Sequence, residues 1–282
     1  MPDVNAEQVF YYRHGLPVRI MHWINALAFF LLLMSGLQIF NAHPALNWGK
    51  SSYDGKPPLL QLEAKRRADG QLQGVTRLGR HEFATTGILG ASRNADGELT
   101  ARGFPAWATL PGPQWLAMGR RWHLFFAWVL VINGIAYLGY AIFSRHLGRD
   151  LAPSRRDWRS VGTSIKEHLL LRHPQGEAAK HYNILQKLAY LSVIFVLLPL
   201  MMITGWSMSP RLDAVLPGWV DLLGGRQSGR TIHFIVAWAL FGFVLIHVFE
   251  VIVSGFWNHL RSMITGRFGI RQEVTAHDNV PH

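Results

Sequence analysis

The sequence predicts an all-α integral membrane protein, built as a bundle of four transmembrane helices with a long outer loop between the first two. Long apolar runs alternate with polar, basic stretches, and 49% of the 282 residues are hydrophobic. Four runs reach the roughly 20 residues that a helix needs to cross the hydrocarbon core of a bilayer. Basic residues gather at the ends of these runs, as is typical of membrane proteins. We therefore interpret the chain, residues 1–282, as a single membrane domain.

The first predicted span, 17–40, follows sixteen polar or mixed residues without a small-residue cleavage site. It is therefore expected to be a retained helix rather than a signal peptide. The second and third spans are predicted at 122–143 and 184–208, and Pro199 is expected to kink the third. The fourth span is predicted at 231–257.

The distribution of basic residues predicts the orientation of the helices. The connection 145–183 holds eight Lys and Arg residues, which predicts a cytoplasmic loop and places both termini in the cytoplasm. The connection 41–121 holds eleven, but loops of this length escape the positive-inside rule, so it is expected on the outer face. Orientation thus explains the net charge of +11 without a nucleic-acid partner.

The chain contains no cysteine. This excludes disulfides, cysteine-ligated iron–sulfur clusters and the covalent attachment of c-type haem. Any haem is therefore held by ligation alone.

Four histidines lie within the predicted spans. His233 and His247 share the fourth span, and the fourteen residues between them rise about 21 Å over nearly four turns. They therefore face the same way at opposite depths. His22 begins the first span and matches the depth of His247, whereas His123 begins the second and matches His233. Each couple is expected to clamp one iron, which predicts two haem b groups: an inner one on His22 and His247, and an outer one on His123 and His233.

Two glycines support this arrangement. Gly36 follows His22 by fourteen residues, and Gly134 follows His123 by eleven, so each lies on its histidine's face at the depth of the other couple. Glycine permits close approach, and we expect both to pack against haem.

Three arginines precede the proposed ligands by three residues. Arg19, Arg120 and Arg230 are each expected on the face of the following histidine, one turn toward water. An arginine suits a carboxylate, so they are candidate partners for the haem propionates.

Other interpretations stand beside these. An intramembrane histidine can be a packed hydrogen-bonding residue, glycine is common in membrane helices, and flanking arginines anchor helices at the interface. Metal transport is disfavoured by the scarcity of carboxylates in the spans. Candidates for a quinone pocket or a proton relay, each with a surface or ion-pair alternative, are His14, His181, Tyr182 and Glu250.

The segments GLPVRIMHWINALAFFLLLMSGLQIF and GRRWHLFFAW, with the histidine pair of the fourth span, resemble the bacterial di-haem cytochrome b family. That family includes the membrane subunits of nickel–iron hydrogenases, formate dehydrogenases and thiosulfate reductases. The long loop is most similar to the thiosulfate-reductase-type branch. The resemblance implies a bacterial inner-membrane electron-transfer subunit that links membrane quinone to a periplasmic partner, with a molybdenum enzyme as the expected partner.

Two rival functions remain at this stage. One is a stand-alone cytochrome that oxidises or reduces a small species such as superoxide against quinone. The other is a haem-free membrane scaffold or transporter.

Overall fold

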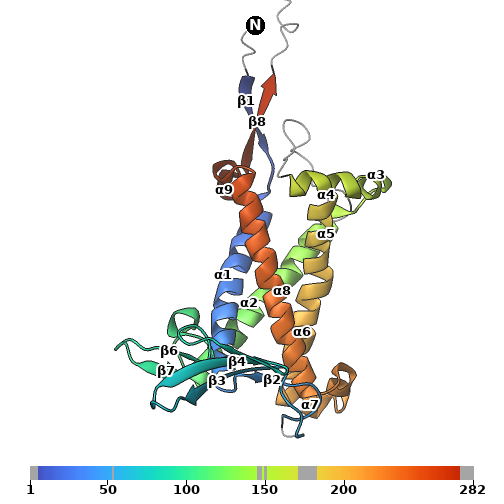
Figure 1. Ribbon diagram of the computed structural model, residues 1–282. Coiled ribbons are helices and arrows are strands. Elements are labelled where there is room, and N and C mark those ends of the chain that lie inside the picture. The colour runs from blue at the N-terminus through green and yellow to red at the C-terminus, as the bar shows by residue number, and fades with distance from the viewer. Residues whose placement is uncertain (1–5, 53, 145–147, 149–150, 171–182, 274–282) are drawn as a thin grey trace, which may run out of the picture. The chain divides into compact units, whose positions relative to one another are not determined.

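The computed structural model describes residues 6–52, 54–144, 148, 151–170 and 183–273. Four helical segments in this part of the chain are long and apolar enough to cross a membrane (Figure 1). They are α1 (Leu16–Asn41), α2 (Leu116–Phe143), the segment Ile184–Ser207, and α8 (Arg226–Val253). A helical segment thus lies at each of the four predicted spans. The second begins six residues before its predicted start at 122, because the helix continues through the polar residues around Arg120.

The chain forms two compact units, and each helical span contributes to both. Unit 1 comprises residues 1–23, 134–196 and 240–282, and unit 2 comprises residues 24–133 and 197–239.

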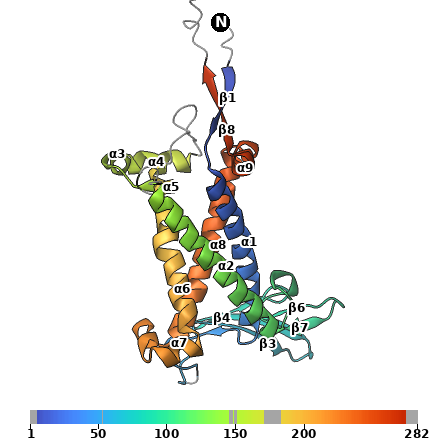
Figure 2. The same ribbon diagram turned by 180° about the vertical axis from the view of Figure 1, so that it is seen from behind.

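The prediction of an all-α fold is wrong, because the segment expected to be a long outer loop contains β-sheet in unit 2. One sheet has four antiparallel strands in the order β2-β3-β4-β5, and a second sheet pairs β6 with β7. Figure 2 labels β3, β4, β6 and β7 of these two sheets. The strands are β2 (Ala45–Leu46), β3 (Leu60–Arg66), β4 (Leu72–Leu78), β5 (His81–Ala84), β6 (Ala91–Arg93) and β7 (Leu99–Ala101). The 3-10 turn η1 (Ala106–Ala108) follows them.

Local sequence explains these hairpins. Along β3, apolar Leu60, Leu62 and Ala64 alternate with polar side chains, which is the period of a strand with one buried face. The turns after β3 and β6 contain Asp-Gly pairs, and their glycines, Gly70 and Gly97, have φ of 79° and 84°. Glycine adopts this left-handed conformation at no steric cost, so both Asp-Gly pairs favour the hairpin turn.

The sheet packs on the ends of helices through an apolar core. Leu62 of β3 lies 2% exposed in a cluster with residues of α1 and of the segment after β7. The cluster comprises Leu37, Phe40, Leu46, Leu62 and Phe104. Asn41, the last residue of α1, donates to the Phe104 carbonyl and accepts from its backbone N–H. The side chain of the last residue of α1 thus binds the backbone of the segment that follows β7.

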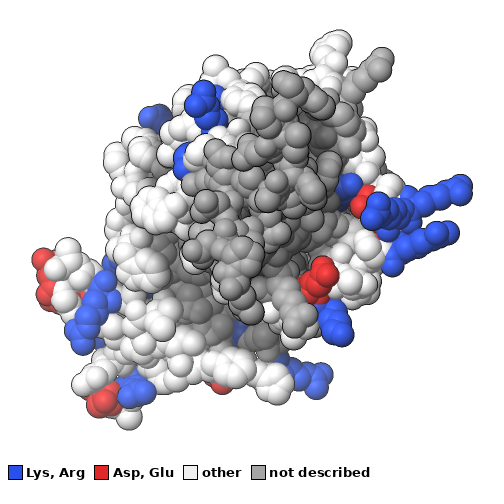
Figure 3. All heavy atoms as spheres, turned by 90° about the horizontal axis from the view of Figure 1, so that it is seen from above, with Lys and Arg blue, Asp and Glu red and all other residues white. Residues whose placement is uncertain are grey.

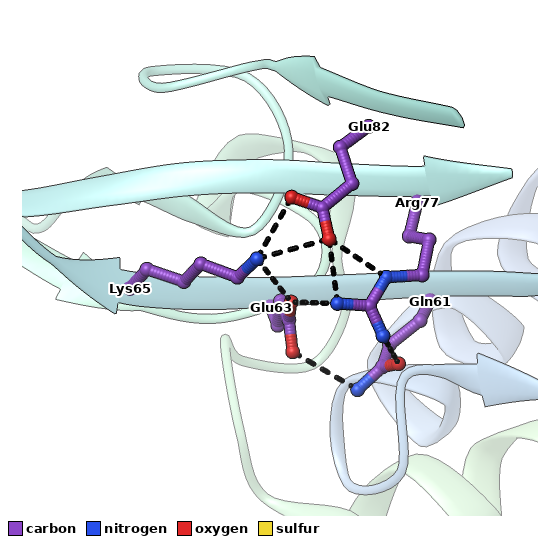
Figure 4. A network of polar contacts seen from close by, with 5 residues as sticks. All are labelled: Gln61, Glu63, Lys65, Arg77 and Glu82. Carbon is purple, nitrogen blue, oxygen red and sulfur yellow. Dashed lines mark hydrogen bonds and ion pairs between the residues drawn. The ribbon is translucent and has the colours of Figure 1, made fainter. Parts of the chain in front are cut away.

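The opposite face of β3 carries a charged network (Figure 4). Lys65 contacts both Glu63 and Glu82 of β5, and Arg77 of β4 bridges the same two carboxylates. Gln61 completes the network through Glu63 and Arg77. Hydrogen bonds from Lys65 and then Arg77 lower the pKa of Glu82. These cross-strand contacts join three strands on a polar face.

Unit 2 also holds the end of the third span and the connection to the fourth. Here α6 (Leu198–Ser207) is followed by α7 (Pro210–Val215) and the 3-10 turn η5 (Trp219–Leu223). The carbonyl of Gly49 accepts from the backbone N–H groups of Gln227 and Ser228, and the Ser228 hydroxyl accepts from the Gly49 N–H. The start of α8 is therefore capped by the segment after β2.

Unit 1 contains a second departure from the all-α prediction. The strands β1 (Ala6–Tyr12) and β8 (Arg267–Glu273) pair antiparallel, with Val9 opposite Ile270 (Figure 1). The fourth span ends at Val253 rather than 257, because Gly255 takes φ 111° and begins the separate helix α9 (Phe256–Thr265).

The predicted cytoplasmic connection 145–183 contains two short helices where it is described. These are α3 (Arg155–Arg159) and α4 (Val161–Leu169). Ser154 and Asp157 form a capping box at the start of α3, and Asp157 also pairs with Lys187 of α5 (Ile184–Ser192) at 2.9 Å. Basic side chains are the more widespread charged groups on the described surface in Figure 3.

The third span is not a regular α-helix throughout. A π-helical turn, Val193–Leu197, lies between α5 and α6. Pro199 has no N–H to donate to the carbonyl four residues earlier, and its ring crowds that carbonyl. The irregularity predicted for Pro199 therefore takes the form of a widened turn just before it.

Candidate haem-binding site

His22 of α1 and His247 of α8 lie together in unit 1. The centroids of their imidazole rings are 6.2 Å apart, with the ring planes at 62°. Aromatic side chains surround the two rings. Phe243 stacks on His247 with centroids 6.0 Å apart, and Trp23 meets His22 edge-on at 5.4 Å.

His123 of α2 and His233 of α8 form a second couple, in unit 2. Their ring centroids are also 6.2 Å apart, at an interplanar angle of 64°. The structure thus brings together the two histidines of each predicted couple, and their role as iron ligands stays a prediction.

The separation of the rings fits a metal held between them. Two metal–imidazole bonds of about 2.0–2.1 Å, together with the distance from each nitrogen to its ring centre, would set the ring centres about 6 Å apart. Both couples match this spacing. Within the described residues, no three His, Cys, Asp or Glu side chains gather as they would around a metal ion held by protein alone. The two imidazole nitrogens of each couple suit an iron whose other ligands come from a porphyrin.

Two buried hydroxyls fix the tautomer of the His123–His233 couple. Nδ1 of His123 lies 3.1 Å from Ser35 Oγ, and Nδ1 of His233 lies 3.0 Å from Thr204 Oγ1. Each hydroxyl donates to the carbonyl four residues earlier, that of Leu31 or Leu200. The hydroxyl oxygens are therefore the acceptors, and each Nδ1 carries the hydrogen. This leaves the lone pair of Nε2 available to a metal.

Each hydroxyl is followed by a glycine that lies against the same imidazole. A Cβ built on Gly36 would lie 3.3 Å from Cε1 of His123, and one built on Gly205 would lie 3.5 Å from Cε1 of His233. Gly36 thus lies beside a histidine of the other couple, and its packing against haem stays a prediction. A Cβ on Gly134 would meet no described protein atom within 4 Å, and the packing of Gly134 against haem stays a prediction.

The three arginines differ in their contacts. Arg19 donates from Nη1 to the Ile264 carbonyl, and Arg230 donates from Nη2 to the His43 carbonyl and lies over the ring of Phe40. Arg120 is exposed. A guanidinium has five N–H donors, so Arg19 and Arg230 keep donors beyond these carbonyl contacts. Burial, and then the neighbouring Arg230 charge, lower the pKa of His43.

The quinone and proton candidates are only partly described. His181 and Tyr182 lie outside the described residues. His14 is half-buried just before α1, where its backbone N–H donates to the Gly266 carbonyl at 3.4 Å. Glu250 is half-buried. Its backbone carbonyl accepts a hydrogen bond from the Ser254 hydroxyl, and the oxygen of that hydroxyl lies 3.1 Å from Nε2 of His259.

Sequence analysis missed Ser35, Thr204 and Gly205. The signal was present as a small hydroxyl residue followed by glycine within an apolar span, in MSGL and ITGW. Such a pair lets a neighbouring helix approach closely and offers an oxygen at the same level. Only the fold shows that one pair meets His123 and the other meets His233, its partner in the couple.

Two couples of histidines at metal-spanning distance, carried by three of four membrane-length helices, are the arrangement expected of a membrane haem protein. The chain matches the family model for prokaryotic cytochrome b561 over residues 13–266, and it belongs to that family. Haem b is the cofactor of this family, and the haem-free scaffold considered from the sequence is therefore wrong.

Relatives with assigned names agree with this family. The chain is 32% identical over 147 residues, 51% of its length, to 69% of a putative protein-methionine-sulfoxide reductase subunit, YedZ1, from Azospira oryzae. It is 23% identical over 269 residues to a probable Ni/Fe-hydrogenase B-type cytochrome subunit from Cupriavidus necator, covering 90% of this chain and 85% of that protein. A subunit of the same name from Rhodobacter capsulatus is 22% identical over 265 residues, covering 90% and 80%.

Proposed function

We propose that this chain is a di-haem membrane cytochrome b that relays electrons between the quinone pool and an oxidoreductase partner. In this proposal His22 and His247 bind the iron of one haem, and His123 and His233 bind the other. The observation that carries it is the matched geometry of the two couples, each with ring centroids 6.2 Å apart. A single helix, α8, supplies one histidine to each couple.

Haem iron, when bound, supplies the one-electron chemistry, and the protein tunes its potential. The chain's own residues hold and orient it. Ser35 and Thr204 fix the rings of His123 and His233, while Phe243 and Trp23 pack on His247 and His22. Arg19, Arg120 and Arg230 are proposed to bind the propionates. Arg120 is exposed, and Arg19 and Arg230 retain free donors for a carboxylate.

The partner is proposed from the relatives and from the folded segment 41–121. All three relatives described above are named as subunits, which favours a complex over a stand-alone cytochrome that reacts with superoxide. The sheets of segment 41–121 exceed what a connection between two helices needs, so we propose them as the docking surface. The resemblance to the thiosulfate-reductase-type branch suggests a molybdenum-containing partner on the periplasmic side.

The orientation is proposed from charge. The chain lies in the bacterial inner membrane with both termini in the cytoplasm, which makes His22–His247 the inner couple and His123–His233 the outer one. Quinone then exchanges electrons near the inner couple, with His14, His181, Tyr182 and Glu250 as candidate contacts. Reporter fusions after residues 100 and 165 should give external and internal signals, respectively.

Haem counting tests the number of cofactors. A pyridine haemochrome assay on the purified chain should give two haem b per protein. His22→Ala and His123→Ala should each lose one, and the centres that remain should have different midpoint potentials. His81→Ala, at an exposed position on β5, is the matched control and should keep both. Two variants that retain the same centre would contradict the pairing.

Affinity purification from the native membrane tests the partner. A tagged chain should bring down a molybdenum-containing oxidoreductase, detected by metal analysis of the eluate. Deletion of residues 60–101, which removes β3 to β7, should abolish this association while haem binding is retained. An intact cytochrome that purifies alone and reacts directly with superoxide would favour the stand-alone alternative.

A further inference from the structure

The His123–His233 couple is held from both outer sides by the same two-residue arrangement. On α1, Ser35 meets Nδ1 of His123 and Gly36 lies against the ring. On α6, Thr204 meets Nδ1 of His233 and Gly205 lies against the ring. Two helices that are far apart in sequence thus provide the same pair of contacts. Each supplies a hydroxyl oxygen as acceptor and a glycine beside the ring, α1 to His123 and α6 to His233.

Both hydroxyls are enclosed by protein. Ser35 and Thr204 are each 0% exposed, and water therefore does not compete for their hydrogen bonds. Each also keeps its orientation, because its hydrogen is already committed to a helix carbonyl. The acceptor oxygens are fixed before any cofactor binds, which is how a supporting group around a metal site orients its ligand.

The contacts described for the His22–His247 couple are of another kind. Within the described part of the chain, no hydroxyl or carbonyl hydrogen-bonds to a ring nitrogen of His22 or His247, whose contacts are with aromatic rings instead. The hydroxyls therefore distinguish one couple from the other.

We propose that Ser35 and Thr204 are positioning residues that lower the reduction potential of the iron bound between His123 and His233. An imidazole that donates from Nδ1 becomes a more basic ligand at Nε2. A more basic ligand favours ferric over ferrous iron and so lowers the potential. This inference rests on the proposed function, because it requires that the couple ligate haem.

Redox titration of the purified haem-loaded chain tests the inference. Thr204→Val removes the hydroxyl with little change of shape, and Ser35→Ala removes the other. Each should raise the midpoint of one centre, and the double variant should raise it further. The Leu32 carbonyl, 3.2 Å from Nδ1 of His123, and the Met201 carbonyl beside His233 remain as weaker acceptors, so each single variant should shift the midpoint less than the double variant does.

In the double variant, the preference of the site for ferric over ferrous iron should fall on the order of tenfold. Loss of other supporting contacts at metal sites has effects of comparable size. Tenfold corresponds to about 59 mV for a one-electron couple. The centre that moves is identified as the one lost in His123→Ala. The second centre should keep its midpoint within error.

Two controls separate tuning from general damage. Thr204→Ser keeps the hydroxyl and should restore the original midpoint. Ser207→Ala removes another fully buried hydroxyl of α6, which donates to the Thr204 carbonyl, and it should not move either midpoint.

The outcomes also separate this inference from the proposed function. If the chain binds two haems and His123→Ala removes one, but Thr204→Val and Ser35→Ala leave its midpoint unchanged, the inference alone fails. If His123→Ala and His233→Ala both retain two haems, the ligand assignment fails and takes the inference with it. A shift of equal size at both centres would show a global change and would also overturn the inference.

Discussion

Asn133 of α2 donates a hydrogen bond from Nδ2 to Oδ1 of Asn25 on α1, at 2.7 Å. Both residues lie within the apolar spans, and Asn133 is 7% exposed. A side-chain amide within the hydrocarbon core has no water available as a hydrogen-bond partner. The pair therefore fixes the rotation of α1 against α2 within unit 2, the unit in which Ser35 of α1 must meet His123 of α2.

This pair should couple measurably in a double-mutant cycle. Asn25→Ala and Asn133→Ala should each destabilise the protein, and the double variant should lose less than their sum. The coupling is expected to be about 0.6–1.7 kcal/mol, the range for hydrogen bonds between membrane helices. Reversible unfolding in mixed micelles measures it. A coupling indistinguishable from zero would mean that the two amides find other partners.

Asp157 is expected to make stability depend on pH. The backbone N–H of Ser154, and then Lys187, lower the pKa of its carboxyl to about 2. Because the folded value lies below the unfolded value of 3.8, the contribution is complete above pH 3.8 and is lost as the pH falls toward 2. Asp157→Asn should remove this dependence and cost about 1 kcal/mol at pH 7, since the pair is partly exposed to solvent. Equilibrium unfolding at pH 7, 4 and 2.5 measures the effect, and the aspartate and asparagine proteins should converge at the lowest pH.

The spans and the shared face of His233 and His247 could be predicted because both depend on short-range rules. Length and apolarity define a membrane helix, and a spacing of fourteen residues places His233 and His247 on one face whatever the surroundings. The end of the fourth span nevertheless differs from its predicted position, because a local signal in the sequence was not used. Gly255 follows the fourth span closely, and its left-handed conformation ends that helix before Trp257.

The sheets were missed because composition was given more weight than periodicity. The segment 41–121 is rich in Gly and polar residues, yet LQLEAKR alternates and Asp69-Gly70 is a hairpin turn. The pairing of β1 with β8 could not be predicted locally, since it joins strands some 260 residues apart. The contacts of Ser35 and Thr204 with the histidines could not be predicted for the same reason. They depend on how two helices pack, which the sequence of one span alone does not determine.

The network on the sheet face should make the sheet sensitive to acid and to salt. The pKa of Glu82 is lowered by Lys65 and then by Arg77, so its contribution is complete above the ordinary value of 4.5 and is lost as the pH falls through the lowered value. All its contacts are exposed to solvent, and added salt should weaken them. Glu82→Gln should reduce the salt dependence of the thermal midpoint at pH 7, relative to the Glu98→Gln control. Equal salt dependence in all three proteins would show that the network contributes nothing measurable.

Gly36 and Gly205 offer a matched pair of substitutions at one couple. Alanine should raise the helix propensity equally at both positions, so a difference between the variants reports contact with the histidines. A Cβ at Gly36 lies 3.3 Å from His123, tighter than an ordinary contact, whereas the 3.5 Å at Gly205 is ordinary. We therefore expect Gly36→Ala to shift the spectrum and midpoint of the centre lost in His123→Ala, and Gly205→Ala to shift them less.

Gly36→Leu should displace the His123 ring, at a cost of about 1–3 kcal/mol for overpacking, and should lose that haem while the other is kept. Haem counting and redox titration on membrane-inserted protein decide the matter. Loss of both haems would show general misfolding, and two unchanged centres in Gly36→Leu would show that the glycine does not support His123.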